Sequence, residues 1–326
     1  MKKILLRLLI SAAFIALLLY LMRNDIPEIL GTLRSADHGL ILLALLIFVA
    51  STVIFAERLQ LIFGAENIRV PILELVNLSF IGYFFNNFLP TSVGGDIVKA
   101  LCAARVTKEP MKSVTTILMD RIFGLFTFIV IPSVSLLFFL KQVGNPKVLL
   151  IVYSFLAVSI FCFFLIFNRS LARQFRFVET LLKWVRLDEK ARRIYDGLHD
   201  FKDRKKVIFW AMMLSVAGQM IGLWILYLAA AALGSKTPMI YFFLLVPVVQ
   251  LVSMVPSLNG LGPREWAYIA LLGPYMGREN AAALSIVWLG MLFVMSLIGG
   301  AIYLARTDYH IRFKEATGDP ATPFKI

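Results

Sequence analysis

The feature that most constrains this chain is its series of long apolar segments, which a soluble fold could not cover. Residues 39–56, 207–232 and 282–305 are examples. At about 1.5 Å per residue, each is long enough for a hydrocarbon core of about 30 Å. Only 16% of the 326 residues are charged, whereas soluble domains carry about 25%. We therefore expect an all-α, polytopic transmembrane helical bundle.

The apolar segments predict six full spans within a single integral membrane domain, residues 1–326. They are 4–22, 39–56, 113–140, 148–167, 207–232 and 282–305. The first begins like a signal peptide, but the polar sequence after it contains no small-x-small cleavage site. We therefore interpret it as a retained span.

Two further apolar segments, 72–98 and 240–274, are interrupted near their middles by proline and glycine, at 89–95 and 255–263. Proline removes a backbone donor and glycine relaxes the helix. Broken backbone at membrane depth is tolerated only where protein or a water-filled cavity covers it. We predict that each segment is a re-entrant helical hairpin that leaves the membrane on the side it entered.

The distribution of Lys and Arg predicts the orientation of the chain. If both termini are cytoplasmic, 25 of the 33 Lys and Arg residues lie inside and 6 lie outside, as the positive-inside rule requires. The net charge of +13 then reflects topology and contact with anionic lipids. Because the basic residues lie between apolar segments, we expect no nucleic-acid binding.

This topology predicts an inverted repeat, with repeat 1 at about 1–141 and repeat 2 at about 147–306. Each half reads span, span, broken segment, span, and the halves begin on opposite sides of the membrane. Residues 168–206 form a cytoplasmic insert with apolar residues at mostly helical spacing. An amphipathic helix on the membrane surface and a solvated connector both fit this insert.

Three segments resemble the signature of one known family. They are 86–100 (NNFLPTSVGGDIVKA), 119–124 (MDRIFG) and 256–265 (PSLNGLGPRE). The family is the lysylphosphatidylglycerol synthase transmembrane region, also called flippase-like, and the resemblance covers about residues 4–305. It implies movement of a lipid or lipid-linked head group between leaflets of a bacterial or archaeal cytoplasmic membrane. Relatives linked to dolichol-phosphate sugar chemistry extend the expected substrates to polyprenyl phosphates.

The same resemblance bears on catalysis. Full synthases of this family add a cytosolic aminoacyl-transfer domain, for which the sequence after residue 305 leaves no room. The chain also shows no nucleotide-binding loop, Ser/His/Asp arrangement or metal-ligand spacing. We therefore expect no enzyme activity, cofactor or metal.

The two breaks and one charged pair supply the candidate head-group site. A half-helix that restarts after Pro90 would direct free N–H groups at a phosphate, and arginine can bind a phosphate through two parallel donors. The candidate residues are Thr91, Ser92, Gly94, Gly95, Asp96, Lys99, Asp120, Arg121, Ser257, Asn259, Arg264 and Glu265. Each break also has a purely structural interpretation, in which Thr91 or Ser92 only caps a helix and Arg264–Glu265 only fixes hairpin depth.

Other interpretations stay open. Asp120 and Arg121 need partners inside the bundle, for which Glu57, Arg58, Asp96 and Lys99 are candidates, and such a network could simply lock the repeats together. We interpret Glu57–Arg58 as a snorkelling pair at the cytoplasmic boundary.

The expected partner is an anionic phospholipid or a polyprenyl phosphate, with homo-oligomerisation or an enzyme partner left open. The alternative functions are a membrane-embedded accessory subunit or enzyme, with Asp96, Asp120 and Glu265 as acid/base groups, and a scaffold.

Overall fold

The computed structural model describes residues 25–88, 94–143, 199–255 and 260–309, together with Ser257 and a few positions between 150 and 161. Throughout this described part the regular structure is helical. Within the described residues, four helices are long and apolar enough to cross a membrane: α3 (His38–Ala65), α6 (Pro110–Val143), α11 (Lys205–Ala232) and α14 (Arg278–Ala305). They confirm the predicted spans at 39–56, 113–140, 207–232 and 282–305. The predicted spans 4–22 and 148–167 lie wholly or mostly outside the described residues.

The ends of the long helices follow from local capping. Asp37 begins α3, because its carboxylate accepts hydrogen bonds from the backbone N–H groups of Gly39 and Leu40. This satisfies two of the donors that a first helical turn leaves free. Gly277, with φ of 89°, separates α13 from α14, a backbone conformation that favours glycine.

Both predicted breaks separate helices that pack on each other. The first lies between α4 (Ile72–Phe88) and α5 (Gly94–Thr107), and the second between α12 (Met239–Val252) and α13 (Pro263–Met276). Gly95 sets the distance between α4 and α5: a Cβ there would lie 2.1 Å from the carbonyl oxygen of Gly82. Each predicted interruption therefore lies between two helices that contact each other. Re-entrance of the two pairs, and their entry from opposite membrane faces, stay predictions.

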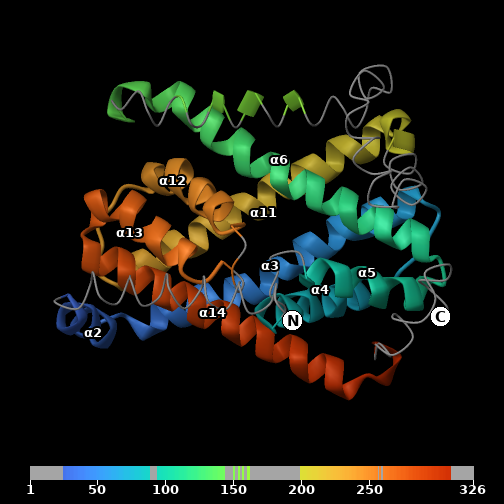
Figure 1. The fold of residues 1–326 in the computed structure, drawn as a ribbon, viewed down its shortest axis with the longest axis horizontal. Coiled ribbons are helices and arrows are strands. Elements are labelled where there is room, and N and C mark those ends of the chain that lie inside the picture. The colour runs from blue at the N-terminus through green and yellow to red at the C-terminus, as the bar shows by residue number, and fades with distance from the viewer. Residues whose placement is uncertain are drawn as a thin grey trace.

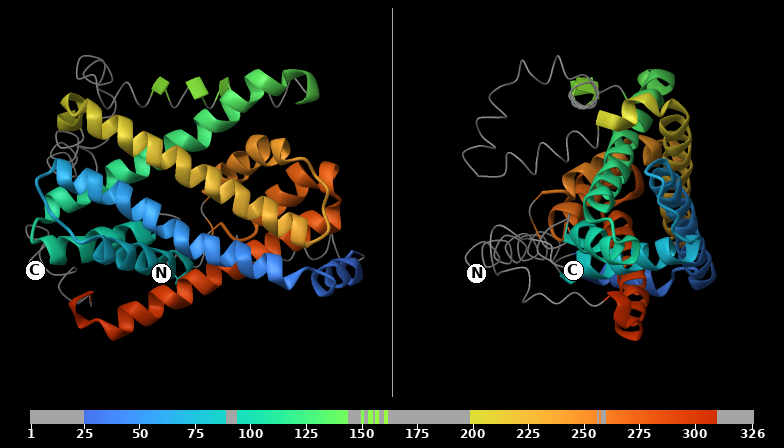
Figure 2. Two further views of the ribbon diagram at one scale, coloured as in Figure 1. Left: turned by 180° about the vertical axis from the view of Figure 1, so that it is seen from behind. Right: turned by 90° about the vertical axis from the view of Figure 1, so that its right-hand side faces the viewer.

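The two predicted halves are interleaved. Helices α3 and α11 pack side by side along much of their length, as Figure 2 shows. Helix α14 packs on α4 and α13, whereas α6 packs on α12 and α5, so each half's last helix contacts the other half's broken segment (Figure 1). This exchange is the packing that an inverted repeat predicts. The repeat boundaries themselves stay a prediction.

Close contacts between helices hold this arrangement together. A Cβ at Gly299 of α14 would lie 1.9 Å from the carbonyl oxygen of Phe80 in α4. The short helix α2 (Ile26–Arg34) packs beside α14.

Of the predicted insert 168–206, the structure describes 199–206, where η1 (Asp200–Asp203) precedes α11. Phe201 is fully buried there with Ile62 and Phe123.

Candidate functional site

A cavity of about 330 Å³ lies among the helices, lined by residues from α3, α4, α5, α6, α11 and α12, by Arg264 of α13 and by residues of α14. This volume is at the lower end of the range of about 300–1,000 Å³ for small-molecule pockets. The charged side chains on its wall are Arg58, Asp96, Lys99, Asp120, Arg121 and Arg264. The cavity is large enough for a polar head group.

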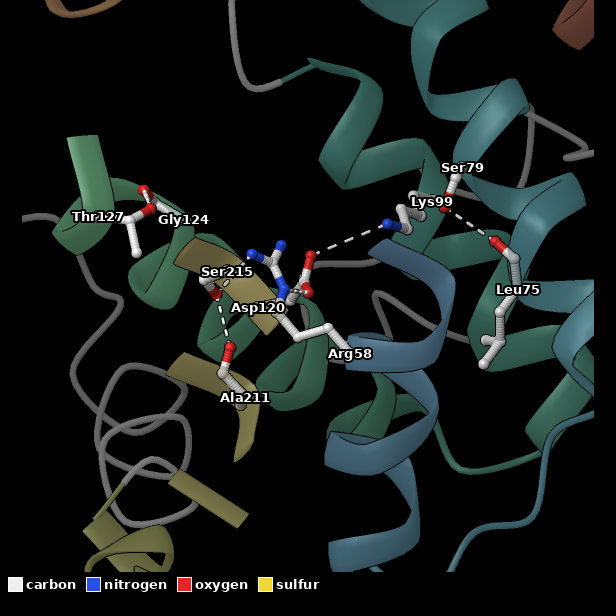
Figure 3. A network of polar contacts seen from close by, with 9 residues as sticks. All are labelled: Arg58, Leu75, Ser79, Lys99, Asp120, Gly124, Thr127, Ala211 and Ser215. Atoms are coloured by element: carbon white, nitrogen blue, oxygen red, sulfur yellow. Dashed lines mark hydrogen bonds and ion pairs between the residues drawn. The ribbon is translucent and has the colours of Figure 1, made fainter. Parts of the chain in front are cut away.

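Arg58 is the centre of the charged network (Figure 3). Its Nε donates to Oδ1 of Asp120 over 2.7 Å, and its Nη1 donates to the hydroxyl of Ser215 over 2.8 Å. Arg58 is only 6% exposed, so both interactions are shielded from solvent. This one guanidinium joins α3, α6 and α11, and therefore connects both predicted halves of the chain.

The neighbouring charges Asp120 and Arg121 face different partners. Lys99 of α5, which is 7% exposed, directs its ammonium at Oδ2 of Asp120 over 3.9 Å. Arg121 pairs with Oδ2 of Asp96 over 3.3 Å. Adjacent helical residues project about 100° apart, which explains the divergence. The prediction that each charge has a partner inside the bundle is confirmed.

The second break supplies another buried cation. Arg264, 3% exposed, donates through Nε and Nη2 to Oε1 of Glu265 over 3.0 and 2.8 Å. Oε2 of Glu265 accepts from the N–H of Gly262 over 2.6 Å, which closes the first turn of α13. Gly260 and Gly262 have φ of 75° and 96°, so the break depends on glycine at both positions.

The structure brings five of the twelve predicted site residues to the cavity wall: Asp96, Lys99, Asp120, Arg121 and Arg264. Glu265 lies behind Arg264. The Ser257 hydroxyl donates to the carbonyl of Val255 over 3.1 Å, within the break. Thr91, Ser92 and Asn259 lie outside the described residues.

The two glycines at the start of α5 have a packing role. Gly94 and Gly95 are buried, and the N–H of Gly95 donates to the side-chain oxygen of Asn86 over 2.8 Å. A head group that approached the backbone at Gly95 would need the space beside it. Gly82 and Asn86 of α4 occupy that space. Through its bond to Gly95, Asn86 therefore satisfies a backbone donor in the first turn of α5.

The snorkelling interpretation of Arg58 is wrong. Glu57 is exposed, whereas Arg58 faces the bundle and lies on the cavity wall. The sequence signal for a buried Arg58 was Asp120, since a carboxylate inside a span requires a cation nearby. Sequence reasoning also missed Gln219 and Gln250, two cavity-lining carboxamides within apolar helices. Polar side chains at such positions are costly unless they face the bundle interior.

The charge balance of the wall determines what it can bind. Four cationic side chains and two carboxylates line the wall, and Glu265 behind Arg264 adds a third carboxylate. One positive charge is in excess, so the cavity attracts anions. Among the described residues, no three His, Cys, Asp or Glu side chains cluster as a metal site would require. A phosphate matches the arginine and lysine donors.

Membrane-length helices, broken segments and a buried charged cavity define a polytopic membrane protein with an internal polar site. The chain belongs to the lysylphosphatidylglycerol synthase TM region family, whose profile matches residues 4–300. It is also similar to the UPF0104 membrane protein PH1989 of Pyrococcus horikoshii. That similarity is 24% identity over 333 aligned positions, 93% of this chain and 97% of the relative. No solved structure matches the chain significantly.

Proposed function

We propose that this protein is a flippase-like translocator that moves an anionic lipid head group across a cytoplasmic membrane. The observation that carries the proposal is the cavity among membrane-length helices, with four cations against the three carboxylates of Asp96, Asp120 and Glu265. A buried excess of positive charge is costly unless an anion compensates it. The head group of a membrane lipid supplies that anion while its tails stay in the bilayer.

In the proposed mechanism, the carboxylates hold the cations when lipid is absent. Asp96 pairs with Arg121, and Asp120 pairs with Arg58 and Lys99. An incoming phosphate takes the place of a carboxylate at one of these cations. The two broken segments enter from opposite faces, both termini are cytoplasmic, and rocking of one repeat against the other exposes the cavity alternately.

The same pairing favours translocation over the enzyme alternative. Asp96, Asp120 and Glu265 each have a cationic partner within 3.3 Å. A carboxylate that faces a cation in this way is poorly placed to take a proton from a substrate, because general-base catalysis requires a direct hydrogen bond. We therefore propose that no chemical step occurs in the cavity and that no cofactor takes part.

Reconstitution into liposomes tests the function directly. Fluorescent phosphatidylglycerol and a fluorescent polyprenyl phosphate are incorporated, and their movement between leaflets is followed by quenching from outside. We expect Lys99→Gln to slow translocation by about 10- to 100-fold, the effect of losing one charge-assisted contact. Glu57→Gln, an exposed neighbour of the site, is the matched control and keeps the wild-type rate. Wild-type protein that is folded but moves no tested lipid would refute the proposal.

A further inference from the structure

The cavity has a second, uncharged part. Gln219 of α11 and Gln250 of α12 line it, together with Ser51, Thr52 and Ser253. An aromatic wall completes this part: Phe48 stacks on Trp288 with ring centroids 5.0 Å apart. The edge of Tyr83 meets Phe48 at a centroid distance of 5.8 Å.

This uncharged part is displaced from Arg58 along the bundle. Phe48 and Arg58 both line the cavity from α3, and their ten-residue separation corresponds to about 15 Å along a helix. Ser215 contacts Arg58, and Gly218 lies against Phe55, so α11 runs antiparallel to α3. Gln219 therefore lies beyond Ser215 toward the Phe48 end, and the cavity is elongated with chemically different ends.

Several polar groups in the uncharged part lack a partner. Thr52 is 1% exposed, and its hydroxyl has no hydrogen-bond partner within the described chain. Nor does the described part of the protein offer a hydrogen bond to either carboxamide. A buried hydroxyl is nearly always hydrogen-bonded, so Thr52 suits a ligand that supplies a hydrogen bond. Gln219 and Gln250 are half-buried, and their carboxamides can bond the same ligand. A carboxamide offers both donors and an acceptor, and so does an alcohol hydroxyl.

We infer that the head group is a phosphate ester of an uncharged polyol or sugar, an inference that rests on the proposed function. The phosphate binds the Arg58, Lys99 and Arg121 side chains. The hydroxyls of the polyol bind Gln219, Gln250 and Thr52, and its C–H faces pack on the aromatic wall. The excess positive charge of the cavity disfavours a cationic head group.

Binding to the full-length protein in detergent tests this inference without requiring transport. The probes are short-chain phosphatidylinositol, which has a polyol phosphate, phosphatidic acid, which lacks the polyol, and phosphatidylcholine, which carries a cation. We expect phosphatidylinositol to bind at least tenfold more tightly than either of the others. Inositol 1-phosphate is the same head group without acyl chains. Weaker binding of inositol 1-phosphate than of phosphatidylinositol would show that the ligand is a membrane lipid rather than a free phosphate ester.

Substitutions assign the selectivity to the carboxamides. Gln219→Leu and Gln250→Leu should each lower the ratio of phosphatidylinositol to phosphatidic acid affinity about fivefold, the effect of one uncharged hydrogen bond. Gln60→Leu is the matched control, because Gln60 is an exposed glutamine of α3 whose side chain bonds the Val70 carbonyl. It leaves the ratio unchanged.

The outcomes separate the two proposals. Equal affinity for phosphatidylinositol and phosphatidic acid, tighter binding of phosphatidylcholine or of inositol 1-phosphate, or no binding of any probe would overturn the polyol inference. An unchanged affinity ratio in both glutamine variants would overturn it as well. Selective binding without movement in liposomes would refute translocation and leave the ligand class supported.

Discussion

Replacing Asp120 by asparagine tests whether the buried ion pair holds three helices together. The carboxylate lies 2.7 Å from Nε of Arg58 and 3.9 Å from the ammonium of Lys99. Asparagine keeps the size of the side chain and removes its charge. The variant therefore leaves two cations in a shielded site without the counter-ion that they share.

The expected loss follows from this geometry. Removing one partner of a buried ion pair costs about 3–5 kcal/mol, because the other charge stays buried and uncompensated. Lys99, at the longer distance, contributes the smaller share. Arg58→Met removes the other partner and also the bond to Ser215. The double variant buries neither charge, so its loss should be about 2 kcal/mol smaller than the sum of the two single losses.

The free energy of unfolding is measured by reversible denaturation in mixed micelles, with helix content as the signal. Glu57→Gln is the control, since Glu57 is exposed beside Arg58, and its effect should stay within about 0.5 kcal/mol. A loss below about 1 kcal/mol for Asp120→Asn would contradict the reasoning. Strict additivity in the double variant would also contradict it, because it would mean that the two side chains do not interact in solution.

Two further predictions concern packing and the end of α14. Gly299→Ala should destabilise the protein by several kcal/mol in the same assay, because its Cβ would lie 1.9 Å from the Phe80 carbonyl oxygen. Gly290→Ala is the control and should cause no such loss, since a Cβ there would have nothing within 4 Å. Equal losses of stability in the two variants would contradict the packing argument. Burial raises the pKa of the Tyr309 phenol above its usual 10.0, and its hydrogen bond to Glu74 acts in the same direction. The neutral Tyr309 phenol should thus contribute its full stabilisation below about pH 10 and lose it as the pH rises further. Tyr309→Phe should reduce this loss of stability at high pH. Identical stability profiles against pH for the variant and the wild type would refute the assignment.

The long helices were predictable because their signal is local. Transfer of apolar side chains from water selects the spans, and proline and glycine place the breaks, whatever the rest of the chain does. The helices α4, α5, α12 and α13 therefore begin and end close to the predicted interruptions. The partners of Asp120 and Arg121 were also expected within a short set, since an intramembrane charge requires a counter-charge.

The composition of the cavity was less predictable. Arg58 and Glu57 are adjacent in sequence and both polar, and only the packing of α3 against α6 and α11 places Arg58 inside and Glu57 outside. The same holds for Gly95, whose contact with Gly82 depends on how closely α4 and α5 approach. A helical sequence identifies its faces, but the face that meets another helix depends on residues far along the chain.

The sequence by itself determined that this protein lies in a membrane, which segments are long enough to cross it, and where two of them break. These properties follow from hydropathy and backbone chemistry, which act over one helix length. Only the tertiary structure brought residues from α3, α5, α6 and α13 to one wall and set Gln219 and Gln250 beside them. Cavities form between helices, so their contents depend on long-range packing, which apolar periodicity alone does not specify.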